Sequence, residues 1–493
     1  MLKMSKLSQQ KLRKIIDNAR SYEEYKDACL MLDELVGNNK WKSEDESPFY
    51  DYELIRHRLK LIRNARILND IDELVSIICE GLHGNLGNIG NSELYQVSNI
   101  GTKHLIEEFN EEVRLSLKTI YLDDSHLNLY EKTDFFDRIS QAYGQTALIL
   151  SGAAGLGFFH CGLVKTLLEQ DLLPSVISGS SAGAIFTALI GTRTKEEALA
   201  ELTPERIHEN FGYIFDLSIP FGESVFDPTA LENAIIHFFD LMTFEQAYLK
   251  TGIEINISVS PLDLHQQARL LNHVSARNVI ISTAVKASTA LPYAYPPVQL
   301  CAMTSMGEVR PYIINRKFVD GSISLDIPIQ QLSRIYGVNH TIVSQTNPLV
   351  MPFLPRSDKF KNSIFSMATD YFKQTLRHTS VFGCNAIEKI VPTNTAKLAV
   401  HKTRSILEQS YLGDINIIPK RAIENITKVF SNPTVKSVQQ QMQEAEKATW
   451  PLISRIEATT KICRAIRLYR HKLKVELKEE HIEQANANMR KVS

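Results

Sequence analysis

Residues 176–185 combine a short apolar run, a serine between two glycines and a longer run of small and apolar residues. The central pentapeptide has the form Gly-x-Ser-x-Gly, with Ser181 in the middle and Gly179 and Gly183 at its ends. This pattern is typical of a sharp strand-to-helix turn, which holds a serine hydroxyl at a helix N-terminus where the dipole favours developing negative charge. It predicts a nucleophilic Ser181. The alternative is a Ser/Gly-rich turn without chemistry, because so short a motif also arises by chance.

The residues on either side of this turn predict an α/β fold. Short apolar runs recur between stretches with helical spacing, and such runs suit strands buried in a parallel sheet. Strands that alternate with helices favour a layered fold around a mostly parallel sheet. We therefore place a catalytic domain at residues 145–350. Within it we expect strands at 147–150, 176–177, 253–259, 278–281 and 340–343, and helices at 162–170 and 182–190.

Helical spacing dominates both flanks of this domain. Apolar residues recur at helical intervals through most of residues 1–144, and a glycine- and asparagine-rich stretch at 81–101 predicts loops. The helical period returns after residue 350, where several prolines interrupt it. We expect an N-terminal helical domain at 1–144 and a C-terminal helical region at 351–493.

Composition excludes several classes of protein. The chain has 55 Lys and Arg residues against 56 Asp and Glu, and this balance argues against a general nucleic-acid binder. The six cysteines are scattered without a Cys-x-x-Cys pair, so neither a metal site nor a redox motif is expected. No window of about 18 apolar residues predicts a transmembrane helix, and the N-terminus lacks the apolar core of a signal peptide. We expect a cytoplasmic protein whose membrane contact is peripheral.

A loop of small residues, 151–157, follows the first expected strand. Small residues let backbone N–H groups point at an anion, so one interpretation is a nucleotide or phosphate loop. Against it, Ala154 replaces the central glycine of Gly-x-Gly-x-x-Gly, and no Lys-Ser/Thr pair follows. The favoured interpretation pairs this loop with Ser181, because an acyl-transfer serine needs donors for the oxyanion of its tetrahedral intermediate.

Two residues are candidates for the base that activates Ser181. Asp320 ends an apolar run and precedes Gly321, which would let its carboxylate approach the backbone. The alternative for Asp320 is an ordinary Asp-Gly turn. His160 lies close to the small-residue loop, within the run 158–161. A packed or capping histidine is the favoured interpretation there, rather than the histidine of a Ser-His-Asp triad.

Taken in chain order, the small-residue loop, the serine turn and the Asp-Gly pair resemble the patatin-like phospholipase family. Segments 172–174, 290–292 and 296–297 are similar to the branch of the family that contains triacylglycerol lipases. The N-terminal half resembles the helical domain of uncharacterised role that precedes the patatin domain in this branch. The residues of this second likeness are Trp41, Tyr50, Asp51, Leu54, Ile55, Arg58, Leu61 and Arg63, with segments 85–87, 94–95 and 101–103.

The resemblance implies a patatin-like three-layer fold and a Ser-Asp dyad. Ser181 would attack the ester carbonyl, and Asp320 would accept its proton and later activate water. No metal or other cofactor is implied. The backbone N–H groups that would hold the oxyanion are those of Gly152, Ala153, Ala154 and Gly155, and the glycines that shape the motifs are Gly157, Gly179, Gly183 and Gly321.

The implied substrate is a lipid at a membrane or lipid-droplet surface, with triacylglycerol favoured and phospholipid or lysophospholipid as alternatives. A third interpretation is a catalytically weak lipid-binding scaffold, because Ala153 and Ala154 stand where family members commonly carry glycines. If either position needs a positive φ, alanine there costs on the order of 1 kcal/mol, unless Gly155 makes the turn instead.

A basic segment near the C-terminus, residues 461–474, contains six Lys or Arg residues and no acid. Ile462, Ile466, Tyr469 and Leu473 fall on one face of the helix that it predicts. One interpretation is an interfacial helix that binds a membrane. The other, which we favour, is an amphipathic helix packed on its own domain with a solvated charged face.

Overall fold

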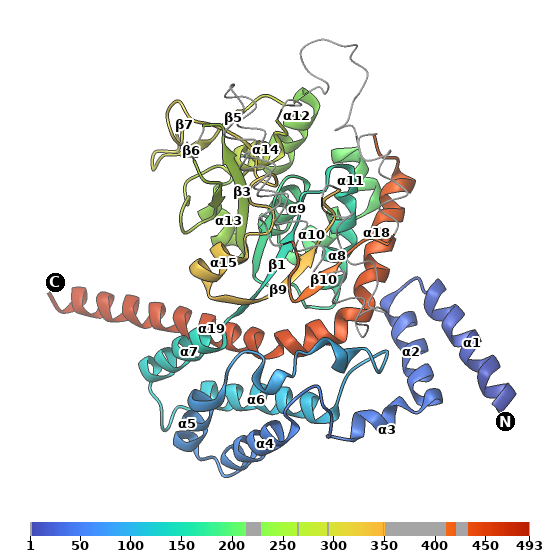
Figure 1. The fold of residues 1–493 in the computed structure, drawn as a ribbon. Helices are drawn as coiled ribbons and strands as arrows, with labels where there is room; N and C mark the ends of the chain where they lie inside the picture. Colours follow the sequence, from blue (N-terminus) through green and yellow to red (C-terminus); the bar gives the residue numbers. More distant parts are fainter. Residues whose placement is uncertain are drawn as a thin grey trace, which may run out of the picture. The chain divides into compact units, whose positions relative to one another are not determined.

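The computed structural model describes residues 2–212, 228–263, 266–292, 295–348, 350, 411–420 and 432–492. The chain divides into two compact units (Figure 1). The first comprises Met1–Thr146, Gly337–His340 and Thr449–Ser493, and the second Ala147–Tyr336 and Thr341–Ala448. Most of the helical pattern expected just after residue 350 falls on 351–410 and lies outside the described residues.

The first unit is helical, as its apolar spacing predicts. Side chains of Asp51, Asp70 and Asn128 accept backbone N–H groups at the starts of three of its helices, which satisfies donors that lack an intrahelical partner. The expected loop at 81–101 holds only two short 3-10 helices, Leu86–Asn88 and Ser92–Tyr95. The helices are α1 (Leu2–Asn18), α2 (Tyr22–Val36), α3 (Asn38–Ser43), α4 (Tyr52–Ile67), α5 (Ile71–Gly81), α6 (His104–Leu122), α7 (Leu129–Tyr143) and α19 (Ile453–Val492).

The basic segment 461–474 lies in α19, which runs alongside α6 and α7 (Figure 1). Ile462, Ile466 and Leu473 are buried in the core of the first unit, together with apolar residues of α4 to α7. On the outer side, Arg470 and Lys474 both pair with Asp137 of α7. The packed-helix interpretation is therefore confirmed, and the apolar face of this segment is already covered by its own unit.

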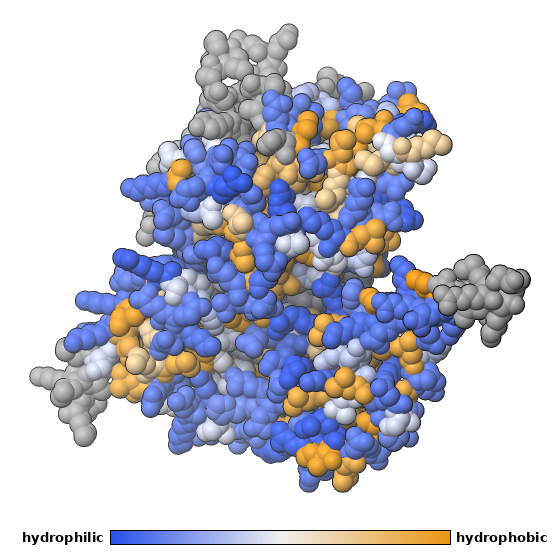
Figure 2. All heavy atoms as spheres, turned by 180° about the vertical axis from the view of Figure 1, so that it is seen from behind, coloured by the Kyte–Doolittle hydropathy of each residue, from blue (hydrophilic) through white to orange (hydrophobic). Residues whose placement is uncertain are grey.

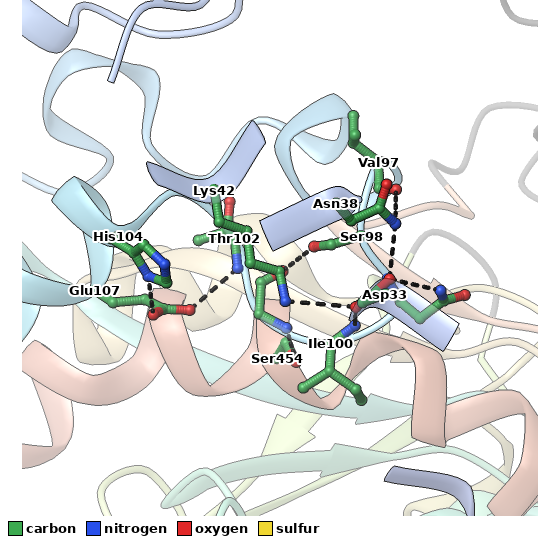
Figure 3. A network of polar contacts seen from close by, with 12 residues as sticks. Asp33, Asn38, Lys42, Val97, Ser98, Ile100, Thr102, His104, Glu107 and Ser454 are labelled. Carbon is green, nitrogen blue, oxygen red and sulfur yellow. Dashed lines mark hydrogen bonds and ion pairs between the residues drawn. The ribbon is translucent and has the colours of Figure 1, made fainter. Parts of the chain in front are cut away.

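A buried carboxylate joins α2 to the loop that precedes α6 (Figure 3). Asp33 accepts hydrogen bonds from the side chain of Asn38 at 2.7 Å, from Lys42 at 3.4 Å and from the backbone of Asn99 at 3.0 Å. Burial acts to raise the pKa of Asp33, but the bonds from Asn99, Asn38 and the Ile100 amide outweigh it and hold the pKa below its usual value. The charged form of Asp33 therefore stabilises this corner of the fold.

The second unit is built on a mostly parallel sheet with the strand order β10-β9-β1-β2-β3-β8-β5 within the described residues. Strands β1, β2 and β3 are parallel to one another, as are β9 and β10, whereas β4 and β8 run antiparallel to β3. The bounds are β1 (Gln145–Leu150), β2 (Val176–Gly179), β3 (Glu254–Pro261), β4 (Arg269–Leu271), β5 (Val298–Gln299), β8 (Lys317–Asp320), β9 (Val338–Ser344) and β10 (Ile415–Ile417). A separate hairpin joins β6 (Cys301–Met303) to β7 (Val309–Pro311).

Helices flank this sheet and complete the three-layer α/β fold that the sequence predicts. The most deeply buried are α8 and α9, and α9 packs on β2 and β3. The helices are α8 (Phe158–Glu169), α9 (Ala182–Gly191), α10 (Lys195–Glu201), α11 (Pro204–Phe211), α12 (Pro228–Phe239), α13 (Phe244–Thr251), α14 (Ile281–Thr289), α15 (Ile329–Tyr336) and α18 (Val435–Thr449).

One expected strand is wrong. Residues 278–281 contribute only isolated bridges at Val279 and Ile280, and α14 begins at Ile281. The apolar run is equally compatible with a buried helix, because periodicity cannot separate the two over so few residues. The other expected strands are confirmed. No helix in the described ranges has both the length and the apolar character that crossing a bilayer requires.

Candidate active site

The strand-to-helix turn predicted around Ser181 is present between β2 and α9. Ser181 has φ 52° and ψ −124°, a conformation that residues with a Cβ rarely adopt. The two flanking glycines allow it, because a Cβ at Gly183 would lie 2.2 Å from the carbonyl oxygen of Leu150. A Cβ at Gly179 would lie 2.3 Å from the oxygen of Gly183. Only glycine therefore fits at either end of the turn.

Hydrogen bonds from neighbouring segments hold this strained turn. The Ser180 amide donates to the Leu150 oxygen at 3.2 Å, which fastens the turn to the end of β1. The Ser181 amide donates at 3.0 Å to the hydroxyl of Ser288 in α14, which in turn donates to the Ser258 oxygen in β3. Bonds to β1 and α14 compensate for a backbone strain of about 1–3 kcal/mol.

Asp320 lies at the end of β8, close enough to the Ser181 hydroxyl for that group to lower the pKa of the Asp320 carboxyl. Its carboxylate accepts the Ser322 amide at 2.8 Å. Burial raises the pKa of Asp320 to about 6, against the lowering effect of Ser322 and Ser181. Gly321 brings this segment close to β3, because a Cβ there would lie 2.2 Å from the Ser258 oxygen. The structure thus brings the two predicted catalytic residues together.

The small-residue loop lies against the same turn. A Cβ at Gly152 would lie 2.7 Å from Cβ of Ser322 and 3.5 Å from Cβ of Ser181, so the loop passes close to Ser181. A Cβ at Gly157 would lie 2.7 Å from Cβ of Ala182, so this glycine allows close packing against the start of α9.

The Gly152 amide is one of the four expected oxyanion donors. It donates instead to Oδ1 of Asp326 at 2.7 Å, so it is already engaged. The amides of Ala153, Ala154 and Gly155 donate no hydrogen bond to any described residue. These three amides remain the candidate donors for an anion beside Ser181.

The turn within this loop is made by alanine. Ala154 has φ 45°, in the left-handed region, whereas Ala153 has φ −145°. Gly155, the alternative position for this turn, has no positive φ. Ala154 therefore carries the strain of about 1 kcal/mol.

Asp326 is a site residue that the sequence analysis missed. Besides the Gly152 amide it accepts the Ser180 hydroxyl and, at 2.9 Å, the side-chain amide of Asn347. It is buried, and burial raises its pKa to about 6. Its position between Leu325 and Ile327 was the available signal, since a carboxylate within an apolar stretch is usually buried and hydrogen-bonded. Asp326 connects the small-residue loop to the serine turn.

His160 is a packed histidine, as the favoured interpretation predicts. It is fully buried, with Nδ1 2.7 Å from the Ser344 hydroxyl and Nε2 3.0 Å from the backbone oxygen of Ser151. Burial lowers its pKa to about 4, so the ring is neutral at physiological pH. It supports the end of β1 and is not hydrogen-bonded to Ser181. Among the described residues, no cluster of His, Cys, Asp or Glu is suited to bind a metal ion.

Comparisons with known proteins agree with this geometry. Residues 148–333 match the family described as patatin-like phospholipase, and residues 2–141 match a domain of unknown function, DUF3336. Triacylglycerol lipase ptl3 of Schizosaccharomyces pombe is 31% identical over 90% of this chain and 94% of its own length. The chain belongs to the patatin-like phospholipase family. The resemblance seen in the sequence motifs is thereby confirmed.

Two further members of the patatin-like phospholipase family show how far the similarity extends. Triacylglycerol lipase ptl2 of S. pombe is 31% identical over 91% of this chain and 73% of its own length. Triacylglycerol lipase 4 of Saccharomyces cerevisiae is 37% identical over 89% of this chain, which spans 50% of that protein's length. The similarity covers both the helical unit and the sheet.

We expect opposite effects from glycine at the two adjacent alanines. Ala154→Gly should stabilise the fold by about 0.5 kcal/mol, because relief of the left-handed strain exceeds the added entropy of the unfolded chain. Ala153→Gly is the matched control, and it should destabilise by about 1 kcal/mol through lost burial and added entropy. Denaturant unfolding measures both, and equal effects would contradict the strain at Ala154.

Removal of the Asp326 carboxylate should loosen the loop. Asp326→Ala leaves three buried donors without an acceptor and should destabilise by about 3 kcal/mol. Asp326→Asn keeps one acceptor oxygen and should cost about 1 kcal/mol. Exposed Glu196→Ala serves as the control and should change stability by less than about 0.5 kcal/mol. Unfolding curves of the two Asp326 variants that coincide with wild type would contradict the role given to Asp326.

Proposed function

We propose that this chain is a lipid acyl hydrolase that cleaves carboxylic esters, with triacylglycerol as its main substrate. The observation that carries the proposal is that Ser181, on its strained turn, lies beside the buried carboxylate of Asp320. A nucleophile beside a base, with unengaged amides close by, suits acyl transfer. The preference for triacylglycerol is supported by the names of the relatives, which are triacylglycerol lipases.

The proposed reaction uses Asp320 as the only base. Ionised Asp320 takes the hydroxyl proton while Ser181 Oγ attacks the ester carbonyl carbon. The amides of Ala153, Ala154 and Gly155 stabilise the oxyanion. The ester C–O bond then breaks, Asp320 returns the proton to the leaving alcohol, and an acyl-enzyme remains. Water, deprotonated by Asp320, releases the fatty acid and restores Ser181.

A pKa of about 6 suits Asp320 to both steps. The carboxylate is ionised at neutral pH, and it is a stronger base than an ordinary aspartate because burial has raised its pKa. The same dyad would also cleave phospholipids or lysophospholipids, so hydrolysis of a panel of purified lipid classes decides the substrate.

The proposal includes a domain division and a location. A helical domain at 1–144 and a catalytic domain at 145–350 are supported by family matches that end at residue 141 and begin at 148. The region 351–493 is the third part of the proposed division, and its described end, α19, belongs to the first compact unit. We place the chain in the cytoplasm, at the surface of a membrane or lipid droplet.

Substitution of the nucleophile tests the reaction. Ser181→Ala should reduce hydrolysis of a soluble short-chain ester by at least about a thousandfold and abolish labelling by a fluorophosphonate. Exposed Ser333 in α15 provides the control, since Ser333→Ala should leave both signals unchanged. A folded wild-type chain that is not labelled would instead support the lipid-binding scaffold.

The pH profile tests the base. Asp320 must be ionised to accept a proton, so kcat/KM for a neutral soluble ester should be constant above about pH 7. Below pH 6 it should fall about tenfold per unit as Asp320 becomes protonated. Asp326 also has a pKa of about 6, so the profile is repeated with Asp326→Asn. Loss of the acid limb in that variant would assign it to Asp326 and contradict the proposal.

A further inference from the structure

The β6–β7 hairpin exposes apolar side chains to solvent. Met306 at its turn is 87% exposed, and Val309 in β7 is 47% exposed. Ile314, just beyond β7, is 76% exposed, and Leu262, just beyond β3, is 43% exposed. Figure 2 shows hydrophobic atoms gathered over this part of the second unit, at the upper right of the view. Apolar side chains that gather in this way usually mark a surface that binds a partner or a membrane.

The hairpin has two chemically different faces. The pairing of Met303 with Val309 and of Cys301 with Pro311 places these four residues on one face, because side chains alternate along a strand. Arg310 lies on the other face and pairs with Glu308 at 2.5 Å. The hairpin is therefore amphipathic, with its apolar face continued by Met306 at the turn.

Backbone bonds fix the hairpin to the body of the second unit. The Met303 amide donates to the Asn278 oxygen and the Ile280 amide to the Cys301 oxygen, both at 2.9 Å. These bonds occupy the outer edge of β6. The hairpin is therefore held in place by the rest of the unit and is not a free loop. Its apolar residues can enter a lipid layer without the loss of conformational entropy that ordering a free loop would cause.

Two adjacent cationic residues, Arg316 and Lys317, lie near the base of the hairpin. Lys317 is exposed and forms no ion pair with a described residue, and its backbone oxygen accepts the Leu262 amide at 3.0 Å. Arg316 lies next to it and pairs with Asp263 at 2.6 Å. Apolar side chains beside lysine and arginine match a lipid surface, in which acyl chains lie beneath anionic headgroups.

The base of the hairpin and Ser181 lie at the same end of the sheet, the end where the parallel strands β2 and β3 have their carboxyl ends. Ser181 follows the carboxyl end of β2, and β3 runs parallel to β2. The carboxyl end of β3, Pro261, pairs with Phe318, directly after Lys317. Asp320 is the other end of that same short strand. A lipid layer into which the hairpin inserts would therefore also face the end of the sheet where Ser181 and Asp320 lie.

We propose that this surface, comprising the β6–β7 hairpin with Leu262, Ile314 and Lys317, inserts into a lipid layer that carries anionic headgroups. The inference rests on the proposed function, and it names the surface by which the chain reaches an insoluble ester. A second copy of the chain fits less well, because Arg310 on the edge strand β7 opposes strand pairing between chains.

Flotation with liposomes tests the surface. The double variant Met306→Glu, Ile314→Glu should reduce the fraction of full-length chain that floats with phosphatidylcholine–phosphatidylserine liposomes by at least about tenfold, because two apolar anchors become charged. Leu249→Glu is the matched control, since Leu249 is also 76% exposed but lies on α13. It should float like wild type. Equal flotation of the double variant and wild type would overturn the proposal.

Hydrolysis separates this inference from the proposed function. The double variant should hydrolyse a soluble short-chain ester at the wild-type rate and emulsified triacylglycerol at least about tenfold more slowly. Equal losses on both substrates would overturn the role of the hairpin as a lipid anchor while leaving the Ser-Asp dyad intact. Absence of Ser181-dependent labelling would overturn the proposed function, and flotation would still test the surface. A dimer by light scattering that only the double variant dissociates, with flotation unchanged, would overturn the lipid partner in favour of a second copy.

Discussion

The hydrogen bonds of one buried carboxylate determine the geometry of the site. Asp326 accepts the Gly152 amide and the Ser180 hydroxyl, so the loop after β1 and the turn after β2 are held by a single side chain. Burying this carboxylate removes it from water, and this desolvation raises the pKa of Asp326 to about 6. The distance between the candidate oxyanion donors and Ser181 depends on these two hydrogen bonds to Asp326. An apolar residue of the same size could fill the space but could not fix that distance.

The strain at Ser181 and Ala154 is concentrated where these two segments meet. Both residues have positive φ values that a Cβ disfavours. The surrounding structure can hold the turn because it is bonded to β1 and α14, and because Gly179 and Gly183 let neighbouring backbone approach closely. Strain of this kind aims a hydroxyl at a defined position before substrate arrives, which reduces the reorganisation that catalysis requires.

Charge and amphipathicity in the sequence did not by themselves distinguish packing from lipid binding. The basic segment in α19 and the β6–β7 hairpin both place apolar residues beside cations. In α19 the apolar face contacts α6 and α7 of the same unit. In the hairpin the apolar residues face solvent. Periodicity describes which residues share a face, but only the arrangement of other elements shows whether that face is already covered.

The sequence by itself determined the parallel α/β core, the helical first unit, the turn at Ser181 and the identity of Asp320 as a candidate base. The core, the helices and the turn follow from local spacing, because strand alternation, helical periodicity and the Gly-x-Ser-x-Gly pattern are set by residues near one another in the chain. The role of Asp320 is implied by the resemblance of the ordered motifs to a known family. Only the tertiary structure decided that Gly152 donates to Asp326, that Ala154 makes the turn, and that residue 281 begins a helix. Segments distant in the chain supply the hydrogen-bond partners and cover the apolar surfaces, and no local pattern specifies which segment will pack at a given place.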